Sequence, residues 1–356
     1  MIKKLIFYFL GLFLLITFII SFDFVLSNTV LKNKNCYKFQ EYYYELKKNC
    51  KAKDKFKSSF PNVNVYTDNL GLRVKKNFIK RNKDKKNILI FGDSFTFGVG
   101  LEHEETYVGL IEKKLTNYNF FNFAVSGYSP SVYLYKLNEM IKSGINPNKI
   151  VLFLDLSDVL DEASRWEYDK NINQIKLTSN EVFKKNLIQS DFKSKNFKIL
   201  KEFSSILNFK LRILRSKINN MFKENSKIDK IKTSIQGNFT YTEIEKLDTR
   251  FWKKNDFNKG INKIKNIFQE IQSISELYNS ELYLVIYPWS ETMVFGQDEF
   301  SWSKFGQELC YKDNCTLIDA IPNFLEYKDK RKNWVNELYF VNDEHWTKEG
   351  HQLAAE

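Results

Sequence analysis

The chain has 356 residues, 43% of which are hydrophobic, and a formal net charge of +12. This length allows one large domain or two, and the apolar fraction is sufficient for a substantial core. The lysines are spread along the whole sequence and do not form basic runs interleaved with glycine or aromatic motifs, which argues against a nucleic-acid module. We therefore attribute the charge to a lysine-rich solvated surface and expect no nucleic-acid partner.

The N-terminus carries an apolar stretch from Leu5 to Phe22, preceded by Lys3 and Lys4 and closed by Asp23. As a helix this stretch would span about 27 Å, close to the roughly 30 Å of a bilayer's hydrocarbon core. It offers no small-x-small site of the kind that signal peptidases cleave. We predict that residues 1–22 form an uncleaved transmembrane signal-anchor, with the rest of the chain extracytoplasmic. Cleavage would instead give a secreted protein.

The four cysteines fall into two pairs that are local in sequence. This favours disulfides Cys36–Cys50 and Cys310–Cys315 in an oxidising compartment, although other pairings and free thiols are open alternatives. A zinc site built from all four is less favoured, because neither spacing is of the C-x-x-C type. We expect no metal.

Beyond the anchor, residues 23–80 show no clear period and predict a stalk or irregular lead-in, and residues 81–356 predict one α/β domain. Short apolar runs alternate with amphipathic segments of helical period there, which is typical of a parallel sheet covered on both faces. Residues from about 165 to 255 interrupt this pattern and predict a helical insertion, either a lid or a structural elaboration. The expected strands are 87–91, 120–124, 150–154, 282–287 and 316–318, and the expected helices are 107–115, 132–141, 261–277 and from 348 onward.

The segment Gly92-Asp93-Ser94-Phe95-Thr96-Phe97-Gly98 directly follows the first predicted strand of the domain. A serine on a tight turn after a strand exposes its hydroxyl beside the backbone N–H groups of the next helix, which is the arrangement that acyl transfer needs. Ligand sites of parallel α/β sheets also lie beyond the carboxyl ends of the strands. Ser94 is therefore the candidate nucleophile, and Ser126 is a weaker alternative.

Only three histidines could supply the general base. His103 lies in an acidic segment that predicts an exposed loop, and His351 lies on the last predicted helix, where it would pack or face solvent. His345 follows Asp343 by two residues, so the carboxylate can orient the imidazole while the second ring nitrogen faces a serine. We predict a catalytic set of Ser94, His345 and Asp343.

Three segments of the chain resemble the conserved blocks of the SGNH (GDSL-type) hydrolases. They are residues 92–98, residues 122–129 (Asn-Phe-Ala-Val-Ser-Gly-Tyr-Ser) and residues 343–356. The last has D-x-H in place of the usual D-x-x-H and is similar to the alginate and peptidoglycan O-acetyltransferase relatives of the superfamily. The resemblance implies a three-layer α/β/α sandwich with a central parallel sheet, the flavodoxin-like SGNH fold, and a reaction without a cofactor.

The resemblance also implies an oxyanion hole made by the backbone N–H groups of Ser94 and Gly127. A third donor is usually an asparagine, and Ser157 stands at that place here. A hydroxyl is shorter than an amide and reaches less far. Trp346, next to His345, is a candidate to contact a sugar ring of the substrate.

The expected function is that of an extracytoplasmic serine esterase that removes O-acyl groups, above all O-acetyl groups, from a glycan or a related ester. Two alternatives use the same residues or the same fold. The first is an O-acetyltransferase that receives its acyl group from a membrane acyl-exporting partner. The second is a non-catalytic, glycan-binding homologue.

Overall fold

The computed structural model describes residues 2–29, 35–40, 43–54, 56, 60–178, 256–297, 300–341 and 343–356. The chain divides into two compact units. The first comprises Met1–Lys34 and Glu181–Ile231, and the second comprises Asn35–Asn180 and Lys232–Glu356.

Helix α1 (Ile2–Thr29) is the described part of the first unit and includes the apolar stretch near the N-terminus. No helix among the described residues has both the length and the apolar character that a membrane crossing requires. The predicted transmembrane segment over residues 1–22 is therefore not confirmed.

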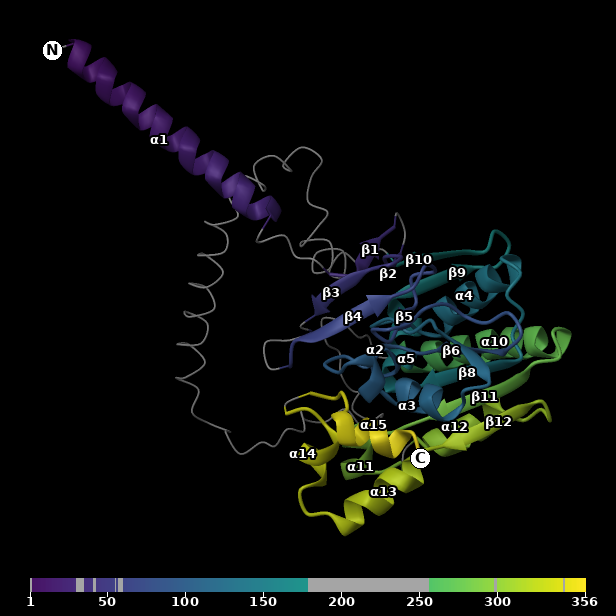
Figure 1. The fold of residues 1–356 in the computed structure, drawn as a ribbon. Helices are drawn as coiled ribbons and strands as arrows, with labels where there is room; N and C mark the ends of the chain where they lie inside the picture. The colour runs from purple at the N-terminus through teal and green to yellow at the C-terminus, as the bar shows by residue number, and fades with distance from the viewer. Residues whose placement is uncertain are drawn as a thin grey trace. The chain divides into compact units, whose positions relative to one another are not determined.

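The second unit is built on a five-stranded, entirely parallel sheet with the order β12-β11-β8-β6-β7 (Figure 1). In chain order this is the 2-1-3-4-5 arrangement of doubly wound flavodoxin-like folds, so the winding direction reverses between β6 and β8. The strands are β6 (Lys86–Phe91), β7 (Tyr118–Asn122), β8 (Lys149–Leu154), β11 (Glu281–Ile286) and β12 (Cys315–Asp319). The predicted parallel α/β sheet is confirmed.

Helices cover both faces of this sheet (Figure 1). Residues on both sides of β6, β8 and β11 are buried, whereas those of the edge strand β12 are half-buried or exposed. On β6, Leu89 and Phe91 face one core, and Ile88 and Ile90 face the other. Burial on both faces explains why the strands appear as continuous apolar runs in the sequence. The first core includes residues of α4 (Pro130–Lys142), α5 (Leu156–Ser164), α10 (Asp256–Leu277) and α12 (Trp302–Leu309). The second includes residues of α3 (Tyr107–Lys114), α11 (Ser290–Phe295), α13 (Ile321–Lys330), α14 (Trp334–Leu338) and α15 (Lys348–Ala354).

Much of the segment expected to be an irregular lead-in, residues 23–80, forms regular elements instead. It forms a hairpin of β1 (Tyr37–Phe39) and β2 (Tyr44–Leu46), then an antiparallel sheet of β3 (Lys51–Asp54), β4 (Val63–Thr67) and β5 (Arg73–Val74). Several of its side chains belong to the main core, among them Tyr44, Leu46 and Val65. The compact unit therefore begins at Asn35 and not at residue 81. Strands of two to five residues are too short for a hydrophobic period to appear in the sequence.

A second hairpin, β9 (Trp166–Asp169) with β10 (Gln174–Leu177), occupies the start of the predicted helical insertion. Trp166 and Ile175 are buried in the core while their neighbours along each strand are more exposed, so the period here is two and not 3.6. The prediction of helices was wrong for these residues. The remainder of the predicted insertion, residues 179–255, lies outside the described residues.

Two disulfides, Cys36–Cys50 and Cys310–Cys315, join the cysteines that are neighbours in sequence. The first links the segment before β1 to the residue before β3, and the second links the end of α12 to the start of β12.

Candidate active site

Ser94 is the first residue of α2 (Ser94–Phe97), a single helical turn that begins three residues after β6 ends. Asp93 caps this turn, since its Oδ1 accepts a hydrogen bond of 2.9 Å from the N–H of Phe95. Gly98 ends the turn in the left-handed region, at φ +75°, which favours glycine. The Asp93 cap and the left-handed Gly98 make the chain reverse its direction at the carboxyl edge of the sheet. Ser94 is partly exposed there.

His345 lies in a tight loop. An isolated antiparallel bridge between Tyr339 and Trp346 closes this loop. The N–H of Phe340 donates to the carbonyl of His345 at 2.9 Å, and the N–H of Asp343 donates to the carbonyl of Phe340 at 3.1 Å. Asp343 Oδ1 in turn accepts from the backbone N–H of His345 at 3.1 Å. The loop therefore fixes the carboxylate against the histidine through the main chain as well as the side chain.

The three predicted catalytic residues form one continuous chain of hydrogen bonds. Asp343 Oδ1 lies 2.5 Å from His345 Nδ1, and His345 Nε2 lies 2.7 Å from Ser94 Oγ. A carboxylate can only accept, so Nδ1 carries a hydrogen and Nε2 of the neutral ring is the acceptor for the serine proton. This is the order of groups that a serine nucleophile with a histidine base requires.

The surroundings of His345 favour its protonated form. The imidazole and the Asp343 carboxyl are almost fully buried, at 3% and 2% exposure. Burial alone lowers the pKa of His345, but the hydrogen bond to Asp343 and the negative charges of Glu344, Asp343 and Asp93 outweigh it and raise the pKa above 6.5. A proton on this ring is therefore stabilised by its surroundings.

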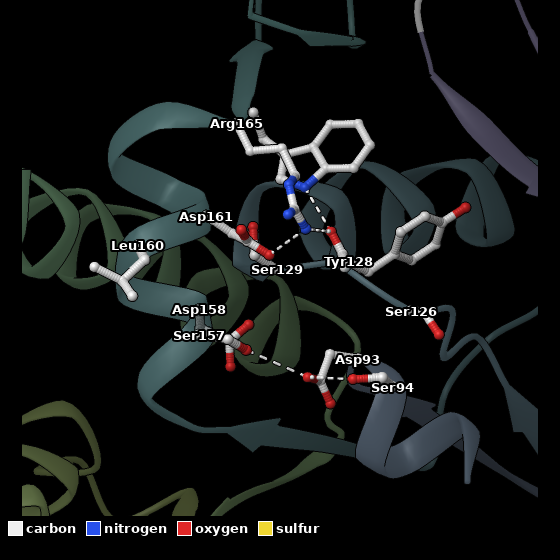
Figure 2. A network of polar contacts seen from close by, with 12 residues as sticks. Asp93, Ser94, Ser126, Tyr128, Ser129, Ser157, Asp158, Leu160, Asp161 and Arg165 are labelled. Atoms are coloured by element: carbon white, nitrogen blue, oxygen red, sulfur yellow. Dashed lines mark hydrogen bonds and ion pairs between the residues drawn. The ribbon is translucent and has the colours of Figure 1, made fainter. Parts of the chain in front are cut away.

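A second carboxylate network contacts Ser94 through Asp93 (Figure 2). Asp93 Oδ2 is 3.2 Å from Ser94 Oγ and 3.3 Å from Ser157 Oγ. Tyr287 Oη bridges Asp93 Oδ1 and Asp155 Oδ2 at 3.3 and 3.2 Å. Burial, followed by the charge of Asp93, raises the pKa of Asp155 to about 7.

Ser157 is engaged differently from its predicted role. Its hydroxyl lies 2.6 Å from Asp155 Oδ1, and its backbone N–H donates to the same oxygen at 2.7 Å. A hydroxyl has a single hydrogen, so donation to an oxyanion would require the bond to Asp155 to break. Asp155 caps α5, and this local capping geometry holds the Ser157 side chain. The structure therefore does not free Ser157 to be an oxyanion donor.

Gly127 lies on a loop whose backbone carbonyls accept hydrogen bonds from several side chains. The carbonyl of Ser126 accepts from Tyr44 Oη at 2.7 Å, and the carbonyl of Gly127 accepts from Trp166 Nε1 at 2.8 Å and from Arg165 Nη1 at 3.2 Å. A Cβ on Gly127 would meet Arg165 Nη1 at 2.3 Å, and the residue has φ +76°, so glycine is required there. Among the described residues, no acceptor takes the backbone N–H of Gly127 or of Ser94.

Arg165 and Tyr44 were not anticipated from the sequence. Arg165 also pairs with Asp161 at 2.6 Å, one helical turn earlier (Figure 2). Burial raises the pKa of Asp161 to about 8 although the Arg165 charge opposes this. The i,i+4 spacing of Asp161 and Arg165 is a weak sequence signal for this pair. Tyr44 lies in the segment that had been expected to be irregular.

Two predictions about single residues, those for Trp346 and His103, were wrong. Trp346 is 1% exposed and stacks on Phe324 with ring centroids 5.0 Å apart, so it belongs to the core and offers no face to a sugar. His103 is buried and not in an exposed loop, with Nε2 3.0 Å from Glu112 Oε2.

His351 packs inside the protein, and burial lowers its pKa to about 3. Ser126 Oγ accepts from Tyr37 Oη at 3.4 Å, whereas His345 contacts Ser94.

The loop that carries His345 also brings together one ligand-type atom each from Asp343, Glu344 and His345, all within 4.8 Å of one another. Two of these atoms already share the 2.5 Å hydrogen bond. The second ring nitrogen of His345, Nε2, contacts Ser94 Oγ.

The second unit is thus a doubly wound α/β domain with a Ser–His–Asp arrangement at its topological switch point. The chain belongs to the family described as "Protein of unknown function (DUF1574)", which matches residues 1–300. The matched residues include Ser94 and Gly127, and Asp343 and His345 follow them.

Solved structures offer more distant likenesses. A lipolytic protein of the G-D-S-L family from Veillonella parvula is 12% identical, with a TM-score of 0.41, covering 76% of this chain and 94% of that one. An acetyl xylan esterase, AlAXEase, is 15% identical, with a TM-score of 0.39 and coverages of 76% and 96%. A variant acetyl xylan esterase from Geobacillus stearothermophilus is 11% identical, with a TM-score of 0.37 and coverages of 76% and 91%. No curated protein matches the chain. With identities this low, the function has to be argued from the site itself.

Proposed function

We propose that this protein is a serine esterase that cleaves O-acyl esters, with Ser94 as nucleophile, His345 as general base and acid, and Asp343 as the group that orients the imidazole. The observation that supports this is the unbroken run of hydrogen bonds from Asp343 through His345 to Ser94, at 2.5 and 2.7 Å. A buried aspartate, a histidine and a partly exposed serine in this order are the parts that acyl transfer uses on unrelated folds.

In the proposed reaction, Ser94 Oγ attacks the ester carbonyl carbon while its proton moves to His345 Nε2. The negative charge that develops on the carbonyl oxygen would be held by the backbone N–H groups of Ser94 and Gly127, which have no acceptor among the described residues. Donors that are fixed before the reaction stabilise such a charge without reorganising. His345 then returns the proton to the leaving alkoxide, and the C–O bond to the alcohol breaks.

The acyl-enzyme at Ser94 is released by water in the second half of the proposed reaction. His345 removes a proton from the water, the hydroxide adds to the acyl carbon, and the proton goes back to Ser94 Oγ as the carboxylic acid leaves. The buried Asp343 stabilises the imidazolium in both halves and stays ionised throughout.

For the substrate, we propose a short acyl group, above all acetyl, on a glycan or a related ester. The aromatic side chains beside His345 support an apolar acyl group, since the rings of Phe56 and Phe60 meet the imidazole edge-on with centroids 5.2 and 6.3 Å away. Phe56 is 38% exposed and can contact a bound ligand. The two disulfides support an oxidising, extracytoplasmic compartment. Transfer of the acyl group from an acyl-exporting membrane partner to a sugar hydroxyl stays a prediction from the sequence.

The test is release of p-nitrophenol from p-nitrophenyl acetate and p-nitrophenyl butyrate by the full-length chain. Ser94→Ala and His345→Ala should each abolish release, and acetate should be preferred over butyrate. Ser273→Ala is the matched control, because this serine is exposed on α10 and its hydroxyl donates to the carbonyl of Gln269 in the same helix, its one hydrogen bond among the residues that the structure describes. Release that survives in Ser94→Ala contradicts the proposal, and a preference for butyrate contradicts the acetyl assignment.

A further inference from the structure

The loop that carries Gly127 contains a β-turn over residues 125–128. The N–H of Tyr128 donates to the carbonyl of Val125 at 3.0 Å, which closes the turn around Ser126 and Gly127. The φ of Gly127 is +76°, whereas the φ of Ser126 is not positive. A negative φ at the second position and a positive φ at the third define a type II turn.

The peptide group between Ser126 and Gly127 can take two orientations in a turn of this length. Types I and II differ by a rotation of this central peptide, which moves the φ of the third residue between about −90° and about +80°. Glycine tolerates both values. Because a trans peptide is planar, its C=O and N–H point in opposite directions and rotate together. The orientation of the Ser126 carbonyl therefore decides where the N–H of Gly127, the proposed oxyanion donor, points.

Tyr44 holds the Ser126 carbonyl in its observed orientation. Its Oη donates to that carbonyl at 2.7 Å, the one hydrogen bond that the carbonyl accepts among the residues that the structure describes. Burial raises the pKa of Tyr44, so the hydroxyl keeps the hydrogen that it donates. Trp166 Nε1 and Arg165 Nη1 donate to the carbonyl of Gly127, which belongs to the next peptide group. Tyr44 is thus the contact that fixes the Ser126–Gly127 peptide.

Tyr44 is itself fixed where the β1–β2 hairpin meets the turn. It is 5% exposed, and its ring packs against Tyr128 and Trp166 with centroids 5.7 and 5.5 Å away. Tyr128 Oη donates to the backbone carbonyl of Tyr44 at 2.6 Å, so the hairpin and the turn exchange hydrogen bonds in both directions. The Tyr44 hydroxyl is therefore positioned before any substrate binds.

We propose that Tyr44 is a positioning residue of the active site, which selects the type II turn and so directs the Gly127 N–H toward the oxyanion. The hydrogen bond to the Ser126 carbonyl also polarises the shared peptide group, which strengthens its N–H as a donor. This inference rests on the proposed esterase function and deepens it by naming the contact that regulates the conformation of its oxyanion donor. Tyr44 acts through the peptide group and not on the reacting atoms.

The kinetic test compares two tyrosines of the same hairpin. Tyr44→Phe removes one oxygen and keeps the ring, but it leaves the Ser126 carbonyl unpaired, so the type I turn becomes competitive. Its kcat for p-nitrophenyl acetate should fall by about five- to tenfold with KM within about twofold, because the lost interaction acts in the transition state. An unchanged kcat overturns the proposal.

Tyr43→Phe is the matched control. Its Oη contacts Glu45 at 3.1 Å and Tyr135 at 3.5 Å, outside the Gly127 loop. Both kcat and KM should stay within about twofold of those of the unchanged chain. Equal losses of kcat in Tyr43→Phe and Tyr44→Phe would mean that the hairpin acts only through its general stability, which also overturns the proposal.

Crystal structures of the unchanged chain and of Tyr44→Phe give a readout that does not depend on activity. In the variant, the Ser126 carbonyl should turn, fully or in a second conformer, with the φ of Gly127 near about −90°. A single conformer that keeps Gly127 at φ +76° overturns the proposal. If the unchanged chain hydrolyses no ester, the proposed function fails, and this comparison still decides whether Tyr44 sets the turn.

A covalent adduct tests the direction of the Gly127 N–H without any variant, in case Tyr44→Phe fails to fold. In a crystal structure of the unchanged chain with a phosphonate bound to Ser94, the phosphonyl oxygen should lie within about 3 Å of the Gly127 nitrogen. A phosphonyl oxygen that points away from this nitrogen overturns the proposal and leaves Ser94 as the nucleophile.

Discussion

The two sides of Ser94 carry carboxylates that differ in what surrounds them. On one side, Asp343 faces an imidazole across 2.5 Å, and the pair sits next to the serine hydroxyl. On the other, Asp93 and Asp155 contact hydroxyl groups and the indole N–H of Trp289, which donates to Asp155 at 2.9 Å. The first arrangement stabilises a histidine that gains a proton, whereas the second leaves buried carboxylates to repel one another.

The pKa directions express this difference. The partners of His345 raise its pKa against the effect of burial, so they stabilise a positive charge next to Ser94. Burial and the neighbouring charges raise the pKa of Asp155 to about 7 and that of Asp158 well above its usual range, so this side retains protons. The difference that bears on Ser94 is therefore one of geometry: His345 Nε2 lies 2.7 Å from Ser94 Oγ, whereas Asp93 is engaged in capping the turn.

The largest expected effect is the loss of the nucleophile or the base. Ser94→Ala and His345→Ala should each lower kcat for p-nitrophenyl acetate by about 10⁴-fold or more, because the residues of such a set act as a unit. Steady-state kinetics of the full-length chain measures this. A loss of less than about tenfold in either variant would show that other residues carry out the reaction.

Asp343→Asn should lower kcat by about 10³- to 10⁴-fold, because an amide can donate to Nδ1 and so favours the tautomer whose Nε2 carries the hydrogen. Glu344→Gln is the matched comparison, since Glu344 Oε1 lies 3.7 Å from the same nitrogen on a more exposed side chain. It should change kcat by less than about threefold. Similar losses in both variants would mean that only the summed negative charge matters.

The pH profile should show the raised pKa of His345. The imidazole acts as a base only when neutral, so kcat/KM should be full above that pKa and fall about tenfold per pH unit below it. Removing the Asp343 charge in Asp343→Asn should move the residual profile to lower pH. The same shift makes His345 a source of stability that is present below pH 6.5 and lost as the pH rises through the raised value. A flat profile between pH 5 and 8 would argue against a histidine base.

Arg165→Met should lower kcat by about tenfold and leave KM nearly unchanged, because Arg165 donates to the carbonyl of Gly127 and so holds the loop that supplies a proposed oxyanion donor. The conservative Arg165→Lys should recover part of the loss, since a lysine can still pair with Asp161. A rise in KM with an unchanged kcat would show that the loop binds substrate and does not act on the transition state.

Asp155→Asn should have the smallest effect on catalysis and a clear one on stability. A carboxyl whose pKa rises on folding destabilises the native state as the pH increases through that value, here about 7. The unchanged chain should therefore melt at lower temperature at pH 8.5 than at pH 6, and Asp155→Asn should reduce this difference by a few degrees. Thermal unfolding followed by circular dichroism measures it. An unchanged pH dependence in the variant would show that Asp155 stays ionised in the fold.

The fold could be predicted where long elements with a clear period exist, such as β6, β8 and α10. The segment 35–74 could not, because its strands are short and its core residues, such as Tyr44 and Val65, are spaced by turns. The β9–β10 hairpin was missed for the same reason. Its alternation covers only four residues in each strand.

The candidate site shows a similar division. Ser94, Asp343 and His345 were found because each lies in a short segment whose local chemistry is informative. Trp346 was misjudged because its indole packs against Phe324 and Tyr287 in the core, contacts between distant segments that its position next to His345 does not reveal. Ser157 was misjudged because its partner Asp155 is set by helix capping. The contact of Arg165 with Gly127 spans 38 residues and has no local signature.

The central claim is that Ser94 is a nucleophile activated by His345. The most direct measurement is to treat the full-length chain with a fluorophosphonate and locate the adduct by peptide mass spectrometry. The account predicts a single phosphonylated residue, Ser94, and no labelling of the His345→Ala variant. An adduct on Ser126, or labelling of Ser94 at the same rate without His345, would contradict it.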